Sequence, residues 1–147
     1  LSVQDITAMV LGGHGDTMVP LPRYTCINGI PIAQFLSKDQ IERIAKRTRE
    51  GGAEILALRK TSSAYDAPAA AVATMVDAIR HDRKRILPCV ALLDGEYGQK
   101  GICMGVPVIL GDRGMEKVVE LDLNPEEQAA FSGSAGQVRA DIARLSF

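Results

Sequence analysis

The fold of this chain is decided by residues 86–121, ILPCVALLDGEYGQKGICMGVPVILGDRGMEKVVEL. Three β-type apolar runs alternate in this stretch with two short loops, DGEYG and GDRG, that are rich in glycine and acidic residues. Loops this short imply that the strands they join are antiparallel neighbours. The stretch therefore predicts an antiparallel sheet whose strands cover residues 86–93, 101–110 and 115–121.

A long helix is predicted over residues 38–59, ahead of the sheet. Ser37 precedes it as the N-cap, and Gln40 stands three residues on, which is the spacing of a capping box. Apolar residues recur at helical spacing, and basic residues fill the wet face. Gly51-Gly52 interrupt the pattern, so we expect a bend or a close packing contact there.

Residues 61–80 are rich in alanine and helical in character, and Pro68 within them requires a helix start, a kink or a break. Their small side chains fit either a buried helix or a subunit interface. Asn124 is expected to cap a final helix that reaches about Leu145. Because strands and helices do not alternate regularly, the pattern predicts an α+β fold, with an antiparallel twisted sheet packed against long helices.

Residues 12–16, Gly-Gly-His-Gly-Asp, carry the chemistry and follow directly on the apolar run 7–11. An apolar run that ends in glycines is typical of a buried strand delivering a side chain to a site. An unperturbed histidine titrates at ~6.5 and exchanges protons near neutrality, while the glycines leave room for a ligand. We expect His14 to lie at a strand end, partly buried and facing a cleft. A tight hairpin is expected at Asn28-Gly29.

Other interpretations of this motif are weaker. One is an ordinary loop histidine. Another is a metal site with Asp16, but zinc needs three or four ligands and the only other histidine is His81, so we assign no metal. A phosphate cradle is excluded because neither GxGxxG nor GxxxxGK[ST] occurs. The basic run at residues 80–85 is interpreted as a solvated cluster at a helix C-terminus.

Composition indicates an ordinary globular domain. The chain has 147 residues, 46% hydrophobic and 24% charged, with 4% aromatics and a net charge of −1. This balance gives no argument for binding nucleic acid or an anionic membrane, and no apolar stretch reaches spanning length. Cys26, Cys89 and Cys103 are scattered in apolar segments, which is typical of reduced thiols in a cytoplasmic protein.

Three segments resemble the lactate/malate dehydrogenase family, and together they span essentially the whole chain. Residues 12–20, GGHGDTMVP, resemble its active-site histidine motif; residues 60–71, KTSSAYDAPAAA, its pocket-closing segment; and residues 105–111, GVPVILG, its late hairpin. The APAAA form, and GGHGD in place of GEHGD, favour the lactate-dehydrogenase-like malate dehydrogenases of bacteria. Ser62-Ser63 and Asp66 depart from the family's commoner Gly-Ser and Tyr, which weakens the pocket-wall assignment.

The resemblance implies the C-terminal substrate and catalytic domain, over residues 1–147, of an NAD-dependent malate dehydrogenase, an enzyme of the tricarboxylic acid cycle. It implies that His14 accepts and donates the proton that interconverts (S)-malate and oxaloacetate. It also implies that a small dicarboxylate is the substrate, with a contribution from Ser62 and Ser63, and that Ala67 and Pro68 are candidates for contacting the cofactor NAD.

The resemblance also implies partners. The family's N-terminal Rossmann domain, with its NAD fingerprint and an Asp-x-x-Arg motif, is absent from this chain, which begins at Leu1. We therefore expect NAD to be bound mainly by that missing domain, and this fragment alone to be inactive. A homodimer or homotetramer is expected, with residues 38–59 or 67–78 at the interface. L-lactate dehydrogenase is the alternative within the family, and a non-catalytic oligomerisation domain is the alternative outside it.

Overall fold

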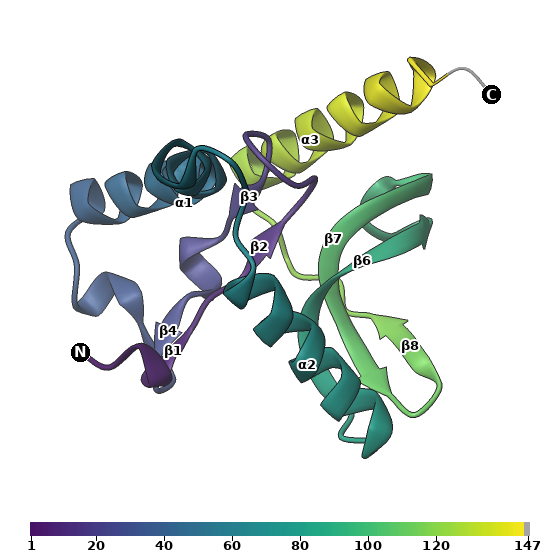
Figure 1. Ribbon diagram of the computed structural model, residues 1–147, viewed down its shortest axis with the longest axis horizontal. Coiled ribbons are helices and arrows are strands. Elements are labelled where there is room, and N and C mark those ends of the chain that lie inside the picture. Colours follow the sequence, from purple (N-terminus) through teal and green to yellow (C-terminus); the bar gives the residue numbers. More distant parts are fainter. Residues whose placement is uncertain (146–147) are drawn as a thin grey trace.

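The predicted antiparallel sheet is confirmed in the computed structural model, which describes residues 1–145 (Figure 1). Its strands are β6 (Arg85–Asp94), β7 (Lys100–Gly111) and β8 (Gly114–Val118), in the order β6-β7-β8. Both pairings are antiparallel. The third strand ends at Val118, three residues before the predicted end, because the chain then leaves the sheet and leads toward the last helix.

The core lies on one face of this sheet. Side chains along β6 and the first part of β7 alternate between more and less buried positions, as the two-residue period of a strand requires, whereas residues 106–108 of β7 are all buried. Helix α3 (Pro125–Ala143) lies against the buried face through Phe131, which is 0% exposed and packs on Tyr97 with ring centroids 5.0 Å apart. The buried cluster comprises Leu11, Val19, Leu21, Ala91, Leu93, Tyr97, Ile102, Met104, Val106, Val108, Val118, Phe131 and Ala135.

The apolar run at residues 7–11 does not form the single buried strand that the sequence predicts. It divides into β1 (Ile6–Thr7), whose residues are exposed, and β2 (Val10–Leu11), whose Leu11 is buried. The two strands join different sheets, since β1 pairs with β4 (Cys26–Ile27) and β2 with β3 (Val19–Pro20). The chain changes partner between them, where the carbonyl of Met9 accepts a hydrogen bond from the Leu21 amide at 2.9 Å.

The predicted hairpin at Asn28-Gly29 is confirmed. It joins β4 to β5 (Ile30–Pro31), and these two strands with β1 make a small sheet in the order β1-β4-β5. Both turn residues have positive φ, 49° and 82°, which is the conformation that an Asn-Gly pair adopts in a two-residue hairpin.

Helix α1 (Lys38–Arg59) has the predicted bounds and the predicted capping box. The Ser37 amide donates to Gln40 Oε1 at 2.8 Å, and the Gln40 amide donates to Ser37 Oγ at 3.4 Å. The last part of α1 is seen nearly end-on whereas the first part lies across the view (Figure 1), so the helix bends. The alternative of close packing at Gly51-Gly52 is wrong within residues 1–145, because a Cβ at either position would meet no atom within 4 Å.

Helix α2 (Asp66–Arg80) begins just before Pro68, which therefore lies in the first turn. This is the place in a helix where a missing N–H removes no internal hydrogen bond. Ala78 is the one residue of α2 that is buried. A fully buried helix is therefore the wrong interpretation of the alanine-rich segment, whose small residues mostly face outward here.

Helix α3 begins with the predicted Asn124 cap and ends at Ala143, close to the expected Leu145. The Glu127 amide donates to Asn124 Oδ1 at 2.8 Å, and the Asn124 amide donates to Glu127 Oε2 at 2.9 Å. Arg23, which follows β3, holds the same carboxylate through its Nη2 at 2.9 Å and lowers the pKa of Glu127. None of the helices in the described residues is long and apolar enough to cross a membrane.

Candidate active site

The loop that carries His14 connects β2 to β3 and is anchored on the central strand of the main sheet. Gly12 and Gly105 of β7 exchange both backbone hydrogen bonds: the Gly12 amide donates at 2.9 Å and the Gly105 amide donates at 2.8 Å. This bridge occupies the edge of β7 that β8 covers further along. The first residue of the histidine motif is thus fixed to the central strand of the main sheet.

Glycine is required at both ends of this bridge. Gly12 has φ +96°, and a Cβ there would lie 2.8 Å from Ser134 Oγ. A Cβ on Gly105 would lie 2.8 Å from the carbonyl oxygen of Gly12. Close backbone approach, rather than loop mobility, therefore explains why glycine precedes the histidine.

Ser134 of α3 forms hydrogen bonds to the histidine loop. This residue was not identified from the sequence. Its Oγ accepts a hydrogen bond from the Gly13 amide at 2.8 Å and donates to Thr17 Oγ1 at 3.3 Å. Ser134 is only 2% exposed. The available signal was a polar residue between Phe131 and Ala135 on the buried stripe of the last helix.

His14 lies at the strand-connecting loop as predicted, but it is exposed rather than partly buried. The expectation of burial failed because no element among residues 1–145 covers the outer side of the loop. The histidine borders a hollow of about 250 Å³ on the sheet side, which confirms the predicted cleft. Within the described chain the imidazole makes no hydrogen bond. The hollow's other lining residues are Val10, Leu11, Gly12, Gly13, Met18, Pro88, Cys89, Val90 and Gly105.

The remaining candidate residues lie in the link that follows α1 and in the first turn of α2. Ser62 Oγ accepts a hydrogen bond from Arg59 Nε at 3.2 Å, and Ser63 is exposed. Ala67 and Pro68 are exposed in the first turn of α2. None of these four residues lines the hollow beside His14, so residues 1–145 alone do not bring the predicted substrate and cofactor contacts together with the histidine.

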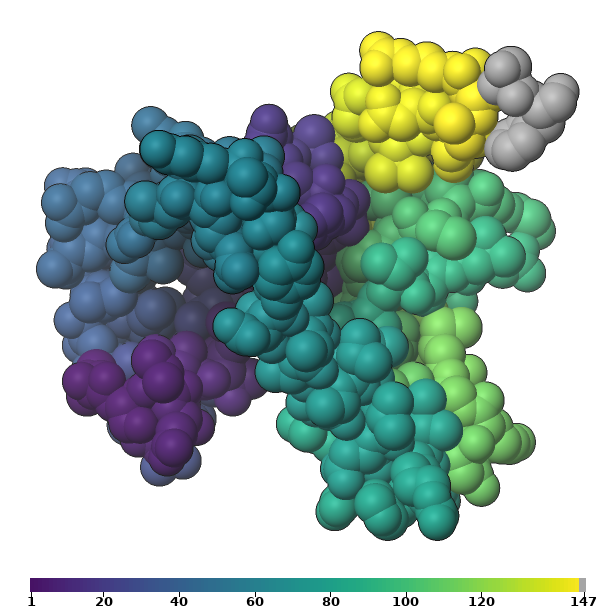
Figure 2. All heavy atoms as spheres, in the orientation of Figure 1, coloured from purple at the N-terminus to yellow at the C-terminus, as the bar shows by residue number. Residues whose placement is uncertain are grey.

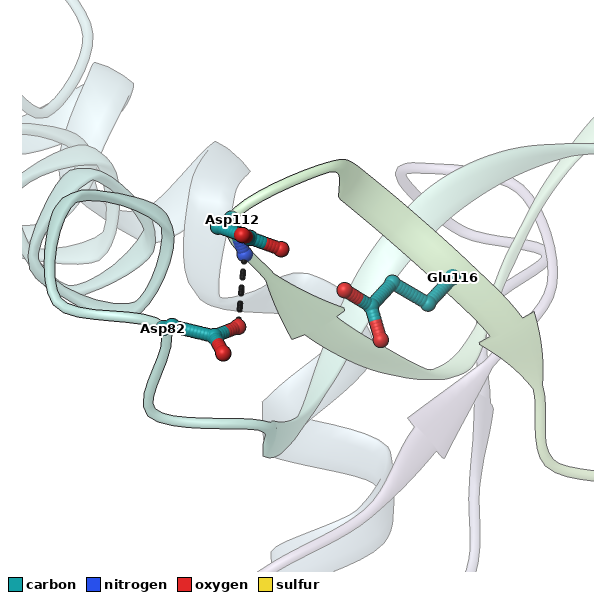
Figure 3. Close-up of side chains that lie close together, drawn as sticks. All are labelled: Asp82, Asp112 and Glu116. Atoms are coloured by element: carbon teal, nitrogen blue, oxygen red, sulfur yellow. Dashed lines mark hydrogen bonds between the residues drawn. The ribbon is translucent and has the colours of Figure 1, made fainter.

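A cluster of carboxylates that the sequence did not reveal lies at the turn between β7 and β8. Oxygens of Asp82, Asp112 and Glu116 are within 4.8 Å of one another (Figure 3), which is close enough for a cation. The Lys84 ammonium already fills this role, with Nζ 2.7 Å from Asp82 Oδ1 and 2.6 Å from Glu116 Oε1. We name these four residues the Lys84 cluster.

The rest of the basic run is a surface cluster, as expected, in which His81 and Arg83 are both paired with Asp77. His81 Nδ1 lies 3.1 Å from Asp77 Oδ1, and Arg83 Nη2 donates to the same oxygen at 3.0 Å. These contacts, that of Arg83 above all, lower the pKa of Asp77. The run closes the end of α2 and does not reach the His14 loop.

Fold and site together define an α+β domain in which an antiparallel sheet presents one histidine on a glycine-flanked loop. Residues 1–146 match the family described as lactate/malate dehydrogenase, alpha/beta C-terminal domain. The chain belongs to this family.

Two curated relatives similar to this chain are named malate dehydrogenase. The chain is 64% identical over 146 residues to a malate dehydrogenase of Nitrosococcus oceani, and 66% identical over 145 residues to one of Thioalkalivibrio sulfidiphilus. Each match covers 99% of this chain but 47% of the relative. The chain thus spans about half the length of the curated relatives it matches.

Solved structures agree with this assignment. A malate dehydrogenase from Salinibacter ruber has a TM-score of 0.93 and 50% identity, covering 97% of this chain and 47% of its own. A lactate dehydrogenase from Cryptosporidium parvum, complexed with lactic acid and NAD, has a TM-score of 0.93 and 38% identity, covering 99% and 49%. The domain is therefore shared by enzymes with two different names.

Proposed function

We propose that this chain is the catalytic half of an NAD-dependent malate dehydrogenase that interconverts (S)-malate and oxaloacetate. The observation that carries the proposal is the exposed His14 imidazole beside a hollow, on a loop held by β7 and α3. Relatives at 64% and 66% identity named malate dehydrogenase support this substrate. L-lactate dehydrogenase is the second candidate, favoured by the likeness to the Cryptosporidium parvum structure.

The chemistry assigned to this chain is proton transfer. Oxidising a 2-hydroxy acid removes a hydride from carbon and a proton from the hydroxyl oxygen. Neutral His14 accepts that proton, and its protonated form returns it when oxaloacetate is reduced. Val10, Met18 and Val90 give the hollow apolar walls, which exclude water from one side of the reacting group.

NAD would supply the acceptor for the hydride, but the described residues do not fit a whole dinucleotide. They contain no glycine-rich phosphate cradle, and a hollow of about 250 Å³ is below the usual size of a cofactor site. We therefore assign NAD binding to a separate N-terminal domain. The lactate dehydrogenase structures with NADH from Eimeria maxima and with NAD from Cryptosporidium parvum are each about twice as long as this chain, which supports that division.

An apolar groove supports a covering domain. It has a volume of about 290 Å³ and lies between α1 and the β1-β4-β5 sheet, where Figure 2 shows a hollow between purple and blue atoms. Two hydroxyls in its lining, Thr25 and Thr48, are bonded within the chain to carbonyl oxygens. Leu1 also lines the groove. The free thiols of Cys26, Cys89 and Cys103 support a cytoplasmic setting.

The test joins this chain to the N-terminal half of the Nitrosococcus oceani malate dehydrogenase and measures NADH production from (S)-malate. We expect His14→Asn to lower turnover by about 10²–10⁴-fold, the usual contribution of a general base. His81→Asn is the matched control and should retain full turnover, because His81 pairs with Asp77 at the surface. Near-normal turnover of the His14→Asn enzyme would refute the role of this residue.

The 147-residue chain by itself provides a second test. It should neither oxidise malate nor bind NAD with useful affinity, because it has no dinucleotide fingerprint. Titration calorimetry with NAD measures this directly. Micromolar affinity would place the cofactor site in this half and overturn the proposed division of labour.

A further inference from the structure

We propose that Ser134 is a positioning residue for His14, acting from the C-terminal helix through the backbone of the histidine loop. The inference rests on the proposed function of His14 and adds a residue that controls it. Ser134 is 2% exposed and sits among the apolar side chains of the core. A polar group in such a place is costly unless it is hydrogen-bonded.

Both hydrogen bonds of the Ser134 hydroxyl go to the histidine loop. The Gly13 amide donates to Ser134 Oγ at 2.8 Å, and Ser134 Oγ in turn donates to Thr17 Oγ1 at 3.3 Å. Gly13 immediately precedes His14, and Thr17 follows it by three residues. One hydroxyl therefore holds both sides of the segment that contains the histidine.

The rest of the loop has few other constraints. Gly12 is fixed to β7 by its pair of backbone bonds, and the Met18 amide closes a turn onto the Gly15 carbonyl at 3.0 Å. His14 itself makes no hydrogen bond in the described chain. The direction of its imidazole therefore depends on the peptide plane between Gly12 and Gly13. Gly105 holds this plane through the Gly12 carbonyl, and Ser134 holds it through the Gly13 amide.

Removing the hydroxyl should loosen the histidine loop without emptying the core, because the Gly12–Gly13 peptide plane would then be held by Gly105 alone. Ser134→Ala keeps the Cβ and deletes one oxygen, so the Gly13 amide loses its acceptor while Phe131 and Ala135 stay packed. A displacement of about 1 Å in a catalytic group can cost on the order of 10²-fold in rate. A residue that only stabilised the fold would leave the turnover of folded enzyme unchanged.

The first experiment uses the joined enzyme described above. We expect Ser134→Ala to lower kcat by at least about tenfold, with KM for malate and NAD changed by less than about twofold. Ser132→Ala is the matched control, because Ser132 is exposed on the same helix, and it should match the parent. Thr17→Val removes only the weaker bond and should lower kcat less than Ser134→Ala does.

The second experiment does not depend on enzyme activity. In the 147-residue chain, NMR should show faster hydrogen exchange at the Gly13 amide and shifted His14 ring resonances in Ser134→Ala, and neither change in Ser132→Ala. An unchanged Gly13 amide and unchanged kcat in folded Ser134→Ala would overturn the inference. If Ser134→Ala does not fold, unchanged His14 resonances in Thr17→Val would overturn it. An inactive parent enzyme would instead refute the proposed function, and NMR would still decide the role of Ser134.

Discussion

Gly12 and Gly15 both adopt positive φ, but they differ in their surroundings. A Cβ on Gly12 would lie 2.8 Å from Ser134 Oγ, whereas a Cβ on Gly15 would meet nothing within 4 Å. We expect Gly15→Ala to cost about 1 kcal/mol of unfolding free energy from backbone strain alone. Gly12→Ala should cost about 3 kcal/mol, because overpacking adds to the strain. Urea unfolding of the two variants measures the difference, and equal losses would contradict the packing of Ser134 against Gly12.

At the residue scale, the sequence was sufficient to predict the position of His14 but not the residues that hold its loop. Glycines around a histidine after an apolar run are a local signal, and they predicted the loop and the hollow. Ser134 is 121 residues away from Gly13, and although its place beside Phe131 and Ala135 indicates burial, nothing local indicates that it contacts the histidine loop. The exposure of His14 depends on what covers the loop, and no element among residues 1–145 covers its outer side.

At the scale of elements, the two capping boxes provide a matched pair. The Asn124 cap bond is 2.8 Å and partly buried, and it begins a helix that covers the core. The Ser37 cap bond is 3.4 Å and exposed, and α1 has no buried residue. We expect Asn124→Ala to cost about 1–2 kcal/mol and Ser37→Ala about 0.5 kcal/mol. Chemical denaturation tests this order, and a larger loss for Ser37→Ala would contradict it.

The Lys84 cluster predicts a pH dependence that ties α2 to the β7–β8 turn. Hydrogen bonding to Lys84 lowers the pKa of Asp82 and of Glu116, and these carboxylates raise the pKa of Lys84. Because the carboxyl pKa values are lower in the folded state than their ordinary 3.8 and 4.5, their stabilisation is present above those values. It is lost as pH falls through the lowered folded-state values. The raised pKa of Lys84 removes its contribution only at high pH.

We therefore expect Lys84→Met to lower Tm at neutral pH, and the difference from the parent to shrink toward zero at strongly acidic pH. The effect should be small and should weaken with added salt, because Lys84 is 45% exposed. Lys46→Met is the control, since Lys46 lies 4.0 Å from Glu50 on the exposed face of α1. A Tm difference that persists unchanged into acid would show that charge pairing is not its cause.

Long elements were predictable, whereas of the short strands the sequence indicated only the hairpin at Asn28-Gly29, which has a turn signal of its own. The three strands of the main sheet and all three long helices carry patterns many residues long, so the sequence located each of them with ends that differ by at most a few residues from those in the structure. Strands β1 and β2 have two residues each, which is too short for a period. Their partners, β4 and β3, are set by tertiary contacts, and this is why residues 7–11 were wrongly expected to be one strand.

At the scale of the whole molecule, the outward faces of α1 and α2 predict self-association. Val72 and Val76 of α2 are 58% and 57% exposed, and Leu58 of α1 is 75% exposed; Figure 2 shows α2 lying uncovered across the front of the molecule. Apolar surface of this kind marks interfaces. Sedimentation velocity should show the joined enzyme as a dimer or tetramer at micromolar concentration, and a strictly monomeric species would contradict this.

A matched pair of variants locates that interface. Val76→Lys should shift the joined enzyme toward monomer, because it puts a charge on the exposed face of α2. Ile142→Lys is the control, since Ile142 is 46% exposed near the end of α3, and it should leave the association state unchanged. Dissociation by Ile142→Lys alone would move the interface to α3.

The reciprocal bonds between Gly12 and Gly105 also determine when the site can form during synthesis. His14 is synthesised well before the strand that holds Gly12 and the helix that carries Ser134. Contacts this distant in sequence form late, since closing the intervening chain costs entropy. The histidine loop is consequently among the last features to become ordered. A nascent or truncated chain that ends before α3 therefore contains His14 but lacks Ser134, which holds the histidine loop.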